Sequence, residues 1–343
     1  MFVPHNRLTH DFQEVAAVER VVRSGHWATG PETQFFEAEL AYFVGRRRCI
    51  AVGSGLAALR LALLTIGARS EDEIIIPAYG CVALANAVLA CGAKPVTADV
   101  IPGAWTLDPA SVANLVGKHT KGIVAVHTFG VAARIDELRR FGIPVIEDCA
   151  HGLSRDHMGT NADIAITSLY ATKLLGAGEG GALLGNDDSV LDAAANMRDY
   201  TDQAPSAFRM NDKLTDLEAA LARVQLAKLD TLIDQRRLHA QFYSQAFADL
   251  EDSDVISLPV DDDNRIWYRY AIQLRQHDVE TVISRLRDQS IGAEQPVWPW
   301  EPTNGNLRHA DQAYRTLLSI PLYPTLTGEE RGSVVAAVRQ VLE

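Results

Sequence analysis

The sequence predicts an α/β protein, with a mostly parallel central sheet that carries helices on both faces and a smaller C-terminal α+β domain. Short, continuous apolar strands alternate with helical segments between residues 49 and 181, a pattern typical of parallel strands buried on both faces. After residue 181 the pattern changes to longer helices and one clear strand. The chain has 343 residues, 47% of them hydrophobic, which is enough to bury two cores.

The first half of the chain opens with two helical segments and then alternates strands with helices. Ser24-Gly25 ends the first helix, and the turn Gly53-Ser54-Gly55 separates the first strand from a helix rich in Ala and Leu. Helices are predicted over residues 11–23, 32–43, 56–64, 81–91, 108–117 and 133–140. Strands are predicted over residues 49–52, 73–77, 94–99, 122–126, 143–146 and 164–168.

The second half is predicted to be mainly helical. Its helices are expected over residues 187–199, 214–249, 277–290 and 327–342, its clearest strand over 267–274 and a rigid connector over 319–324. Residues 200–213 are polar and irregular. We expect the long helical stretch to join two domains, a large one over residues 1–235 and a small one over residues 236–343.

Charge and cysteine usage exclude several classes of function. The formal net charge is −12, which disfavours nucleic acid and anionic membranes as partners. The four cysteines form no CxxC pair and no cluster with zinc-ligand spacing, so free thiols and no metal are expected. The N-terminus lacks the apolar region of a signal peptide, and no apolar run approaches about 18 residues. The expected location is the cytoplasm.

Lys173 is the first candidate functional residue. It follows the strand predicted over residues 164–168 and precedes a glycine-rich loop that ends at Gly180-Gly181. The carboxyl end of a parallel strand lies at the edge of an open α/β sheet where ligands bind. A lysine amine there can form a Schiff base with an aldehyde cofactor such as pyridoxal 5′-phosphate (PLP). A surface lysine on a loop is the alternative interpretation.

The turn at Ser54-Gly55 is a candidate phosphate site, because a glycine turn that opens a helix presents free backbone N–H groups and the positive end of the helix dipole. It lacks the Gly-Lys-Thr end of a Walker loop and the third glycine of a dinucleotide-binding motif. An ordinary tight turn between strand and helix is the alternative.

Asp148 is a candidate partner for a cationic ring nitrogen, since a carboxylate in a mostly apolar setting needs a partner to stay charged. A helix cap or a structural salt bridge is the alternative. Glu147 should point to the opposite side of the strand, so the two carboxylates are not interpreted as an acid–base pair. His127 and His151 either contact the cofactor ring or are hydrogen-bonded structural residues.

Motifs through nearly the whole chain resemble those of the sugar-nucleotide aminotransferase family (DegT/StrS-like), which are PLP-dependent enzymes of the aspartate-aminotransferase (type I) fold. The segments at residues 147–151 and 173–181 are the most discriminating. The matching residues in chain order are 25–31, 54–55, 57–59, 77–79, 92–96, 126–127, 147–151, 168, 170, 173, 178–181, 211, 213, 219–220, 225–226, 229 and 318–324.

The resemblance implies roles for three catalytic residues. Lys173 resembles the Schiff-base lysine, which also moves protons between the substrate carbon and the cofactor carbon. Asp148 resembles the partner of the pyridine nitrogen. His151 matches the position near the phenolic oxygen of the ring.

The resemblance also implies a phosphate cup and a dimer. Ser54, Gly55, the backbone amide of Leu56 and Ser168 resemble the groups that hold the cofactor phosphate. Asn211 matches the asparagine that reaches the cofactor phosphate of the neighbouring subunit. A homodimer with shared active sites is therefore expected.

The sequence departs from the family pattern at two places. Leu56 stands where a threonine is usual, and it offers only its backbone N–H. Gly80-Cys81 stands where a threonine and an aromatic residue are frequent. Cys81 would pack its sulfur on the cofactor ring more weakly than an aromatic side chain. We therefore expect weaker cofactor retention with the proton-transfer groups intact.

The reaction implied by the resemblance moves an amino group from an amino acid, L-glutamate in the family, to a keto sugar on a nucleotide, in polysaccharide or antibiotic-sugar biosynthesis. A cyclitol or another keto substrate is a near alternative. A dehydratase of the same fold would carry histidine in place of Lys173, and a non-catalytic ligand-binding or regulatory protein also stays open.

Loops over residues 25–31, 200–213 and 295–306 would select the sugar, and residues 295–300 either line the entrance of the substrate site or pack between domains.

Overall fold

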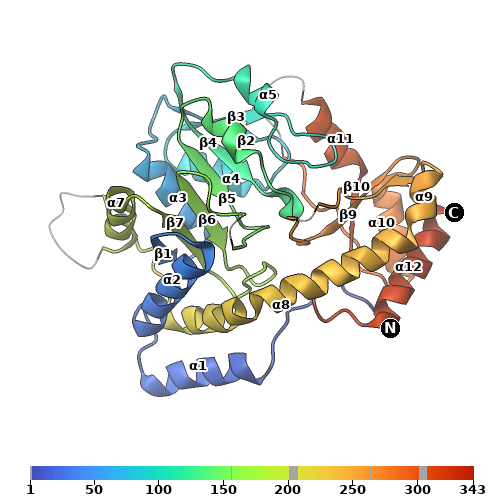
Figure 1. The fold of residues 1–343 in the computed structure, drawn as a ribbon, viewed down its shortest axis with the longest axis horizontal. Coiled ribbons are helices and arrows are strands. Elements are labelled where there is room, and N and C mark those ends of the chain that lie inside the picture. The colour runs from blue at the N-terminus through green and yellow to red at the C-terminus, as the bar shows by residue number, and fades with distance from the viewer. Residues whose placement is uncertain (1, 156, 201–207, 263, 301–306) are drawn as a thin grey trace.

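A seven-stranded sheet forms the centre of the larger part of the molecule (Figure 1). The computed structural model describes residues 2–155, 157–200, 208–262, 264–300 and 307–343. The strands run in the order β1-β7-β6-β5-β4-β2-β3, and among the described strands of this sheet β7 alone runs in the opposite direction to the others. Their bounds are β1 (Arg48–Val52), β2 (Glu73–Pro77), β3 (Lys94–Ala98), β4 (Thr120–Val126), β5 (Val145–Asp148), β6 (Ile164–Ser168) and β7 (Gly181–Gly185).

Helices cover both faces of this sheet, because alternate strand residues bury on opposite sides. Ile50 and Val52 of β1 join the core under one helical layer, whereas Cys49 and Ala51 join the core under the other. The first layer contains α3 (Gly55–Thr65), α4 (Ala83–Ala90) and α7 (Asp188–Arg198). The second contains α2 (Pro31–Val44), α5 (Pro109–Ala113), α6 (Ile135–Arg139) and the first part of α8 (Asp216–Ala246). The predicted mostly parallel α/β architecture is therefore confirmed.

A smaller antiparallel sheet, in the order β10-β9-β8, organises the C-terminal part. Its strands are β8 (Ile256–Ser257), β9 (Tyr270–Leu274) and β10 (Leu317–Ile320), and the helices around it are α9 (Ala248–Asp252), α10 (Val279–Asp288), α11 (Arg308–Thr316) and α12 (Gly328–Leu342). The remaining helices are α1 (Phe12–Ser24), which packs on α8, and the short 3-10 turn η1 (Thr128–Gly130). The second core is thus an α+β unit, as predicted.

The long helix α8 passes from one core to the other (Figure 1). Leu229 and Ile233 pack in a core of the large sheet, whereas Ala240 and Tyr243 pack in the core of the small one. This change of core supports the division into residues 1–235 and 236–343, which stays a proposal. Val3 is an exception to a strict division by sequence, because it also packs in the second core.

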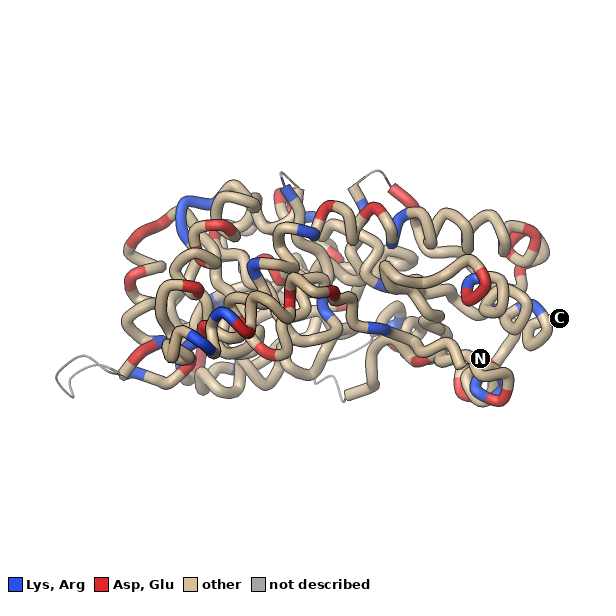
Figure 2. The backbone as a smooth tube through the Cα atoms, turned by 90° about the horizontal axis from the view of Figure 1, so that it is seen from below, with Lys and Arg blue, Asp and Glu red and all other residues tan. Residues whose placement is uncertain are grey.

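Acidic and basic positions are interspersed along the chain in Figure 2. The excess of negative charge, −12 over the whole sequence, is therefore not gathered in one block in this view. Within the described residues, no helix combines the length and the apolar character that a membrane span requires.

Several elements differ from their sequence prediction. Gly181–Gly185 forms β7, where the sequence predicts no strand, and Leu317–Ile320 forms β10, which overlaps the rigid connector predicted over residues 319–324. The strand predicted over residues 267–274 begins only at Tyr270. The backbone N–H of Ile266 donates instead to Gly130 O at 2.9 Å, so the chain before Tyr270 lies against the large domain.

Candidate active site

The predicted site residues converge on one cavity of about 450 Å³ at the carboxyl ends of the parallel strands. Asp148 ends β5, Ser168 ends β6 and Gly55 begins α3 after β1. Two predicted residues, Ser54 and Asn211, do not line it. The residues of the predicted set that line the cavity are Gly55, Leu56, Cys81, Asp148, His151, Ser168 and Lys173.

Asp148 is a buried carboxylate that faces this cavity. One of its oxygens accepts a hydrogen bond from Ala150 N at 2.9 Å. Burial raises the pKa of Asp148, although the Ala150 amide and the nearby Lys173 partly oppose that shift. A cationic hydrogen-bond donor in the cavity would stabilise the ionised form, and the protonated nitrogen of a pyridine ring meets this requirement.

Glu147 points to the opposite side of β5, as predicted, and belongs to a buried network. His127 Nδ1 accepts from Ala133 N at 3.0 Å, so the proton of this neutral imidazole lies on Nε2 and is donated to Glu147 Oε1 at 2.8 Å. Gly159 N and Ala162 N also donate to Glu147. Burial alone would raise the pKa of Glu147, but these hydrogen bonds and His127 lower it.

This network is structural and lies outside the cavity lining. His127, Glu147 and Cys149 do place possible metal-ligand atoms within 4.8 Å of one another. The carboxylate of Glu147 is already held by its hydrogen-bond donors, so we assign no metal to it. Of the two candidate histidines, His151 lines the cavity and His127 does not.

The imidazole ring of His151 lines the cavity and is fixed in place by its neighbours. Its ring stacks on Tyr268, with centroids 4.3 Å apart and an interplanar angle of 14°. Its Nδ1 lies 3.5 Å from the backbone N–H of Phe129, which donates to it. Burial lowers the pKa of His151 well below its ordinary value, and the cations Lys173 and Arg269 add to the effect. The imidazole is therefore neutral near pH 7.

The glycine-rich loop folds back tightly and fixes the position of Lys173. Leu169 N donates to Gly180 O at 2.8 Å, and Ala177 N donates to Leu169 O at 2.9 Å. A Cβ at Gly176 would lie 2.3 Å from Ala171 O, so only glycine fits there. The amine of Lys173 lies 5.1 Å from the centroid of the Tyr268 ring.

The turn between β1 and α3 forms a close cradle with the end of β6. A Cβ added to Gly55 would lie 2.8 Å from Ser168 Cβ, so the missing side chain is what lets the two segments meet. Ser54 is the N-cap of α3, and its Oγ accepts from Ala57 N at 3.0 Å. The first turn of α3 presents its amides at this edge, which suits a phosphate.

Cys81 is exposed and lines the cavity where the family pattern has an aromatic residue. The expected loss of ring stacking stays a prediction.

Both interpretations of residues 295–300 hold in part: Val297 and Trp298 line the cavity, whereas Trp300 Nε1 donates to Gly80 O at 2.9 Å. Of the loops expected to select the sugar, residues 201–207 and 301–306 lie outside the described residues.

The sequence analysis missed Tyr268 and Arg269, which reach the cavity from the segment before β9. Burial alone would raise the pKa of Tyr268, but the positive charges of Lys173 and Arg269 outweigh it and lower that pKa. Arg269 Nη1 lies 3.1 Å from His5 Nε2 and 3.9 Å from Glu294 Oε2. The one available signal was an arginine inside the aromatic run Trp267-Tyr268-Arg269-Tyr270.

Asn211 is exposed and precedes α8. It does not line the cavity of its own chain. Its expected contact with the cofactor of a neighbouring subunit therefore stays a prediction.

The cavity therefore fits PLP by the chemistry of its groups. Lys173 supplies an amine, Asp148 requires a cationic partner, and the Gly55–Ser168 cradle lies at a helix N-terminus.

Comparison with known proteins finds solved structures of similar fold. The solved structure of S. venezuelae DesV in complex with a ketimine intermediate is similar, with a TM-score of 0.90, 28% identity and 99% of each chain covered. A Bacillus subtilis structure, ntda with bound cofactor PMP, has a TM-score of 0.92 and 26% identity, and covers 99% of this chain and 85% of that one. These neighbours have the fold of PLP-dependent aminotransferases.

Two comparisons of sequence lead to the same family. The chain is 33% identical to a dTDP-3-amino-3,4,6-trideoxy-alpha-D-glucose transaminase of Micromonospora megalomicea subsp. nigra, over 95% of this chain and 94% of the relative. The model of the DegT/DnrJ/EryC1/StrS aminotransferase family matches residues 9–339. The chain belongs to the DegT/DnrJ/EryC1/StrS aminotransferase family and is a PLP-dependent aminotransferase.

Proposed function

We propose that this protein transfers an amino group from an amino acid, L-glutamate by resemblance, to a keto sugar linked to a nucleotide. One observation carries the proposal: Lys173, Asp148 and the Gly55–Ser168 cradle line the same cavity. The printed name of the Micromonospora relative, a dTDP-aminosugar transaminase, supports a nucleotide sugar as the acceptor. The presence of lysine at position 173 favours a transaminase over a dehydratase of the same fold.

The residues of this chain then have distinct tasks. Bound PLP supplies an aldehyde that carries the amine and a ring that takes up electrons from the substrate carbon. Asp148 stabilises the proton on the ring nitrogen, and the first turn of α3 with Ser168 holds the phosphate. Lys173 takes the proton from the substrate carbon and returns it to the cofactor carbon. The neutral imidazole of His151 lines the cavity beside these groups and can form a hydrogen bond with the phenolic oxygen of the cofactor ring.

Arg269 is our proposed binding residue for the carboxylate of the amino donor. Among the described residues that line the cavity, Lys173 and Arg269 are the only lysine and arginine. The acidic neighbour of Arg269, Glu294, is 3.9 Å away and half exposed, so the guanidinium can still accept a second anion. A planar guanidinium matches a carboxylate in two parallel hydrogen bonds.

A homodimer with shared active sites and a cytoplasmic location belong to the same proposal. The exposed position of Asn211 supports the dimer, because an exposed side chain can reach a neighbouring subunit. All four cysteines are free, which supports a reducing compartment.

A spectrum tests the proposed function directly. The protein with added PLP should show a visible band that borohydride removes by fixing the cofactor on Lys173, and L-glutamate should convert this band to that of the amine form. Screening keto nucleotide sugars for glutamate-dependent amination then identifies the acceptor. Normal transamination by a Lys173→Ala variant would refute the assignment, and Lys173→Arg is the matched control that retains the charge.

A further inference from the structure

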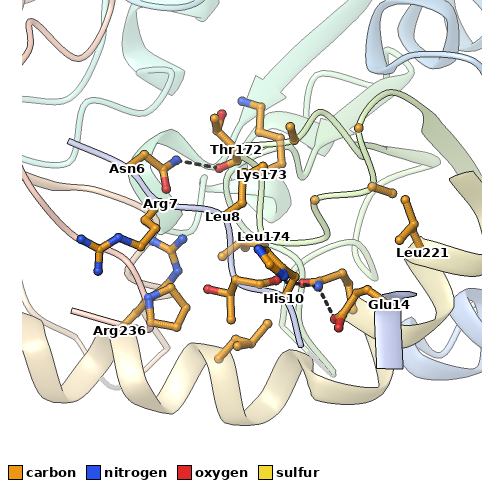
Figure 3. A pocket seen from close by; sticks show the side chains of 18 residues that line it. Asn6, Arg7, Leu8, His10, Glu14, Thr172, Lys173, Leu174, Leu221 and Arg236 are labelled. Carbon is orange, nitrogen blue, oxygen red and sulfur yellow. Dashed lines mark hydrogen bonds between the residues drawn. The ribbon is translucent and has the colours of Figure 1, made fainter. Parts of the chain in front are cut away.

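A second cavity, of about 260 Å³, lies behind the loop that carries Lys173. It is enclosed by the N-terminal segment, by the loop itself and by α8. Figure 3 shows Arg7 and Arg236 on one side of it and Glu14 and Leu221 on the other. The amine of Lys173 points away from it (Figure 3), toward Tyr268. The two cavities therefore lie on opposite sides of one loop.

Arg236 is the unusual group of this second cavity, because it is a buried cation without a counter-ion. Only 5% of its surface is exposed to solvent. Nη1 donates to Leu322 O at 2.9 Å and to Tyr268 O at 3.1 Å. Among the described residues, no carboxylate lies within 4.0 Å of it, and no acceptor pairs with its Nε or Nη2.

Apart from Lys173, whose amine points toward Tyr268, the other lysine, arginine and acidic side chains that line the cavity are paired. Glu14 accepts from Lys228 Nζ at 2.8 and 2.9 Å and from Gln225 Nε2 at 2.7 Å. Arg7 donates to Glu330 at 2.5 Å. Burial lowers the pKa of Arg236 to about 10, so it remains a cation at neutral pH. The cavity therefore contains one uncompensated positive charge, and burial of such a charge is costly unless an anion accompanies it.

The rest of the lining decides the kind of anion. Four leucines line the cavity beside the arginines: Leu8, Leu174, Leu221 and Leu232. A small inorganic anion would leave this apolar surface uncovered, whereas an organic acid would bury its chain there. A carboxylate also matches the planar donor geometry of a guanidinium.

We propose that this cavity binds a small organic monocarboxylate, with its carboxylate on Arg236 and its apolar chain among Leu8, Leu174 and Leu232. Leu232 lies one turn before Arg236 on α8, within reach of a short chain held there. Such a ligand lies on the far side of the loop from the catalytic cavity. It also contacts the backbone next to Lys173 without competing for the substrate site. The proposal is independent of the identity of the sugar acceptor.

Thermal unfolding of the PLP-loaded protein in sodium hexanoate tests this proposal. Hexanoate should raise Tm by about 2 °C relative to sodium chloride at equal ionic strength, because it binds only the folded protein. Sodium acetate should raise Tm less, since it has no chain to bury. An equal rise with acetate, chloride or inorganic phosphate would overturn the proposal.

Variants then locate the response. Arg236→Met removes the charge and keeps the volume, and Leu232→Phe fills the cavity beside Arg236 without a change of charge, so each should abolish the hexanoate effect. Arg269→Met, in the catalytic cavity, should retain it. The proposal fails if Leu232→Phe keeps the full response, or if Arg269→Met loses it. A crystal soaked in 6-bromohexanoate should show the bromine among the leucines that line this cavity, and a bromine found only in the catalytic cavity would refute the site.

Discussion

At the scale of single residues, Asp148 is suited to a bound cationic ligand, and it lowers the stability of the protein without that ligand. Burial raises its pKa, so an ionised Asp148 is unfavourable until a cationic partner arrives. A carboxyl group whose pKa is higher in the folded than in the unfolded state stabilises the fold at a pH below its unfolded-state pKa. That stabilisation is lost as the pH rises through its folded-state pKa. At pH 7 the cofactor-free protein is therefore destabilised by this group.

We predict that Asp148→Asn raises the Tm of the cofactor-free protein at pH 7 while it lowers kcat by about 100-fold or more, because the ring proton loses its partner. The amide still accepts from Ala150 N. The gain in Tm should shrink as the pH falls from 7 to 4, where the wild-type carboxyl becomes protonated. Unfolding curves with and without PLP measure both effects. A destabilised cofactor-free Asp148→Asn protein at pH 7 would contradict the argument.

Cys81 permits a second prediction at this scale. An aromatic side chain at position 81 would stack on the cofactor ring, and such contacts are worth about 0.5–1.5 kcal/mol. Cys81→Phe should therefore lower the Kd of PLP by about 2- to 12-fold. Dialysis followed by absorbance measures the retained cofactor, with Cys81→Ala as the control for simple loss of the thiol. Equal retention by the wild-type and Phe variants would show that another group, such as Trp298, already covers the ring.

The residues found only in the structure show where sequence reasoning ends. Asp148, Ser168 and Lys173 were predictable because each follows a recognisable apolar strand, and parallel strands end at one edge. Tyr268 and Arg269 reach the same cavity from more than ninety residues further along the chain. No local pattern signals such a contact, because it depends on how the small domain packs against the large one.

At the scale of elements, the same distinction separates predicted strands from missed ones. The sequence predicts all of the strands β1 to β6, because most of them contain a continuous apolar run. The missed strand β7 has glycine at both ends, and its pairing with β1 and β6 is set by distant partners. The strand β10 is followed by Pro321, so a connector was the natural prediction. Long-range pairing overrides local propensity at both places.

The junction of α3 and β6 gives a prediction at this scale. Gly55→Ala would place a Cβ 2.8 Å from Ser168 Cβ, so the helix start and the strand end must separate. We expect a loss of about 1–3 kcal/mol in the free energy of unfolding, together with weaker PLP binding. Adding Ser168→Gly should restore most of the stability but not the PLP affinity, because a phosphate contact is gone. If the double variant is no more stable than Gly55→Ala, the clash is not the cause.

At the scale of the whole molecule, the proposed dimer decides whether one chain is a complete enzyme. Asn211 does not line the cavity of its own chain, although the family resemblance assigns it to the cofactor phosphate. Both observations are compatible if Asn211 acts in the site of a partner subunit. A variant that places negative charge there, Asn211→Asp, should repel that phosphate and lower activity.

Subunit mixing then tests whether the active sites are shared. In a heterodimer of Lys173→Ala and Asn211→Asp chains, one site combines an intact Lys173 with an intact Asn211 from the other chain, and the second site carries both changes. Random exchange of the two variants should therefore bring the activity to about a quarter of the wild-type value, above the residual activity of Asn211→Asp alone, since half of the dimers are mixed and each has one intact site. If Asn211 acted within its own chain, no intact site could form and mixing would not raise activity above the average of the two variants. Mixing Lys173→Ala with Lys173→Ala/Asn211→Asp is the control, because neither chain supplies the lysine, and any activity there would discredit the assay rather than support the dimer.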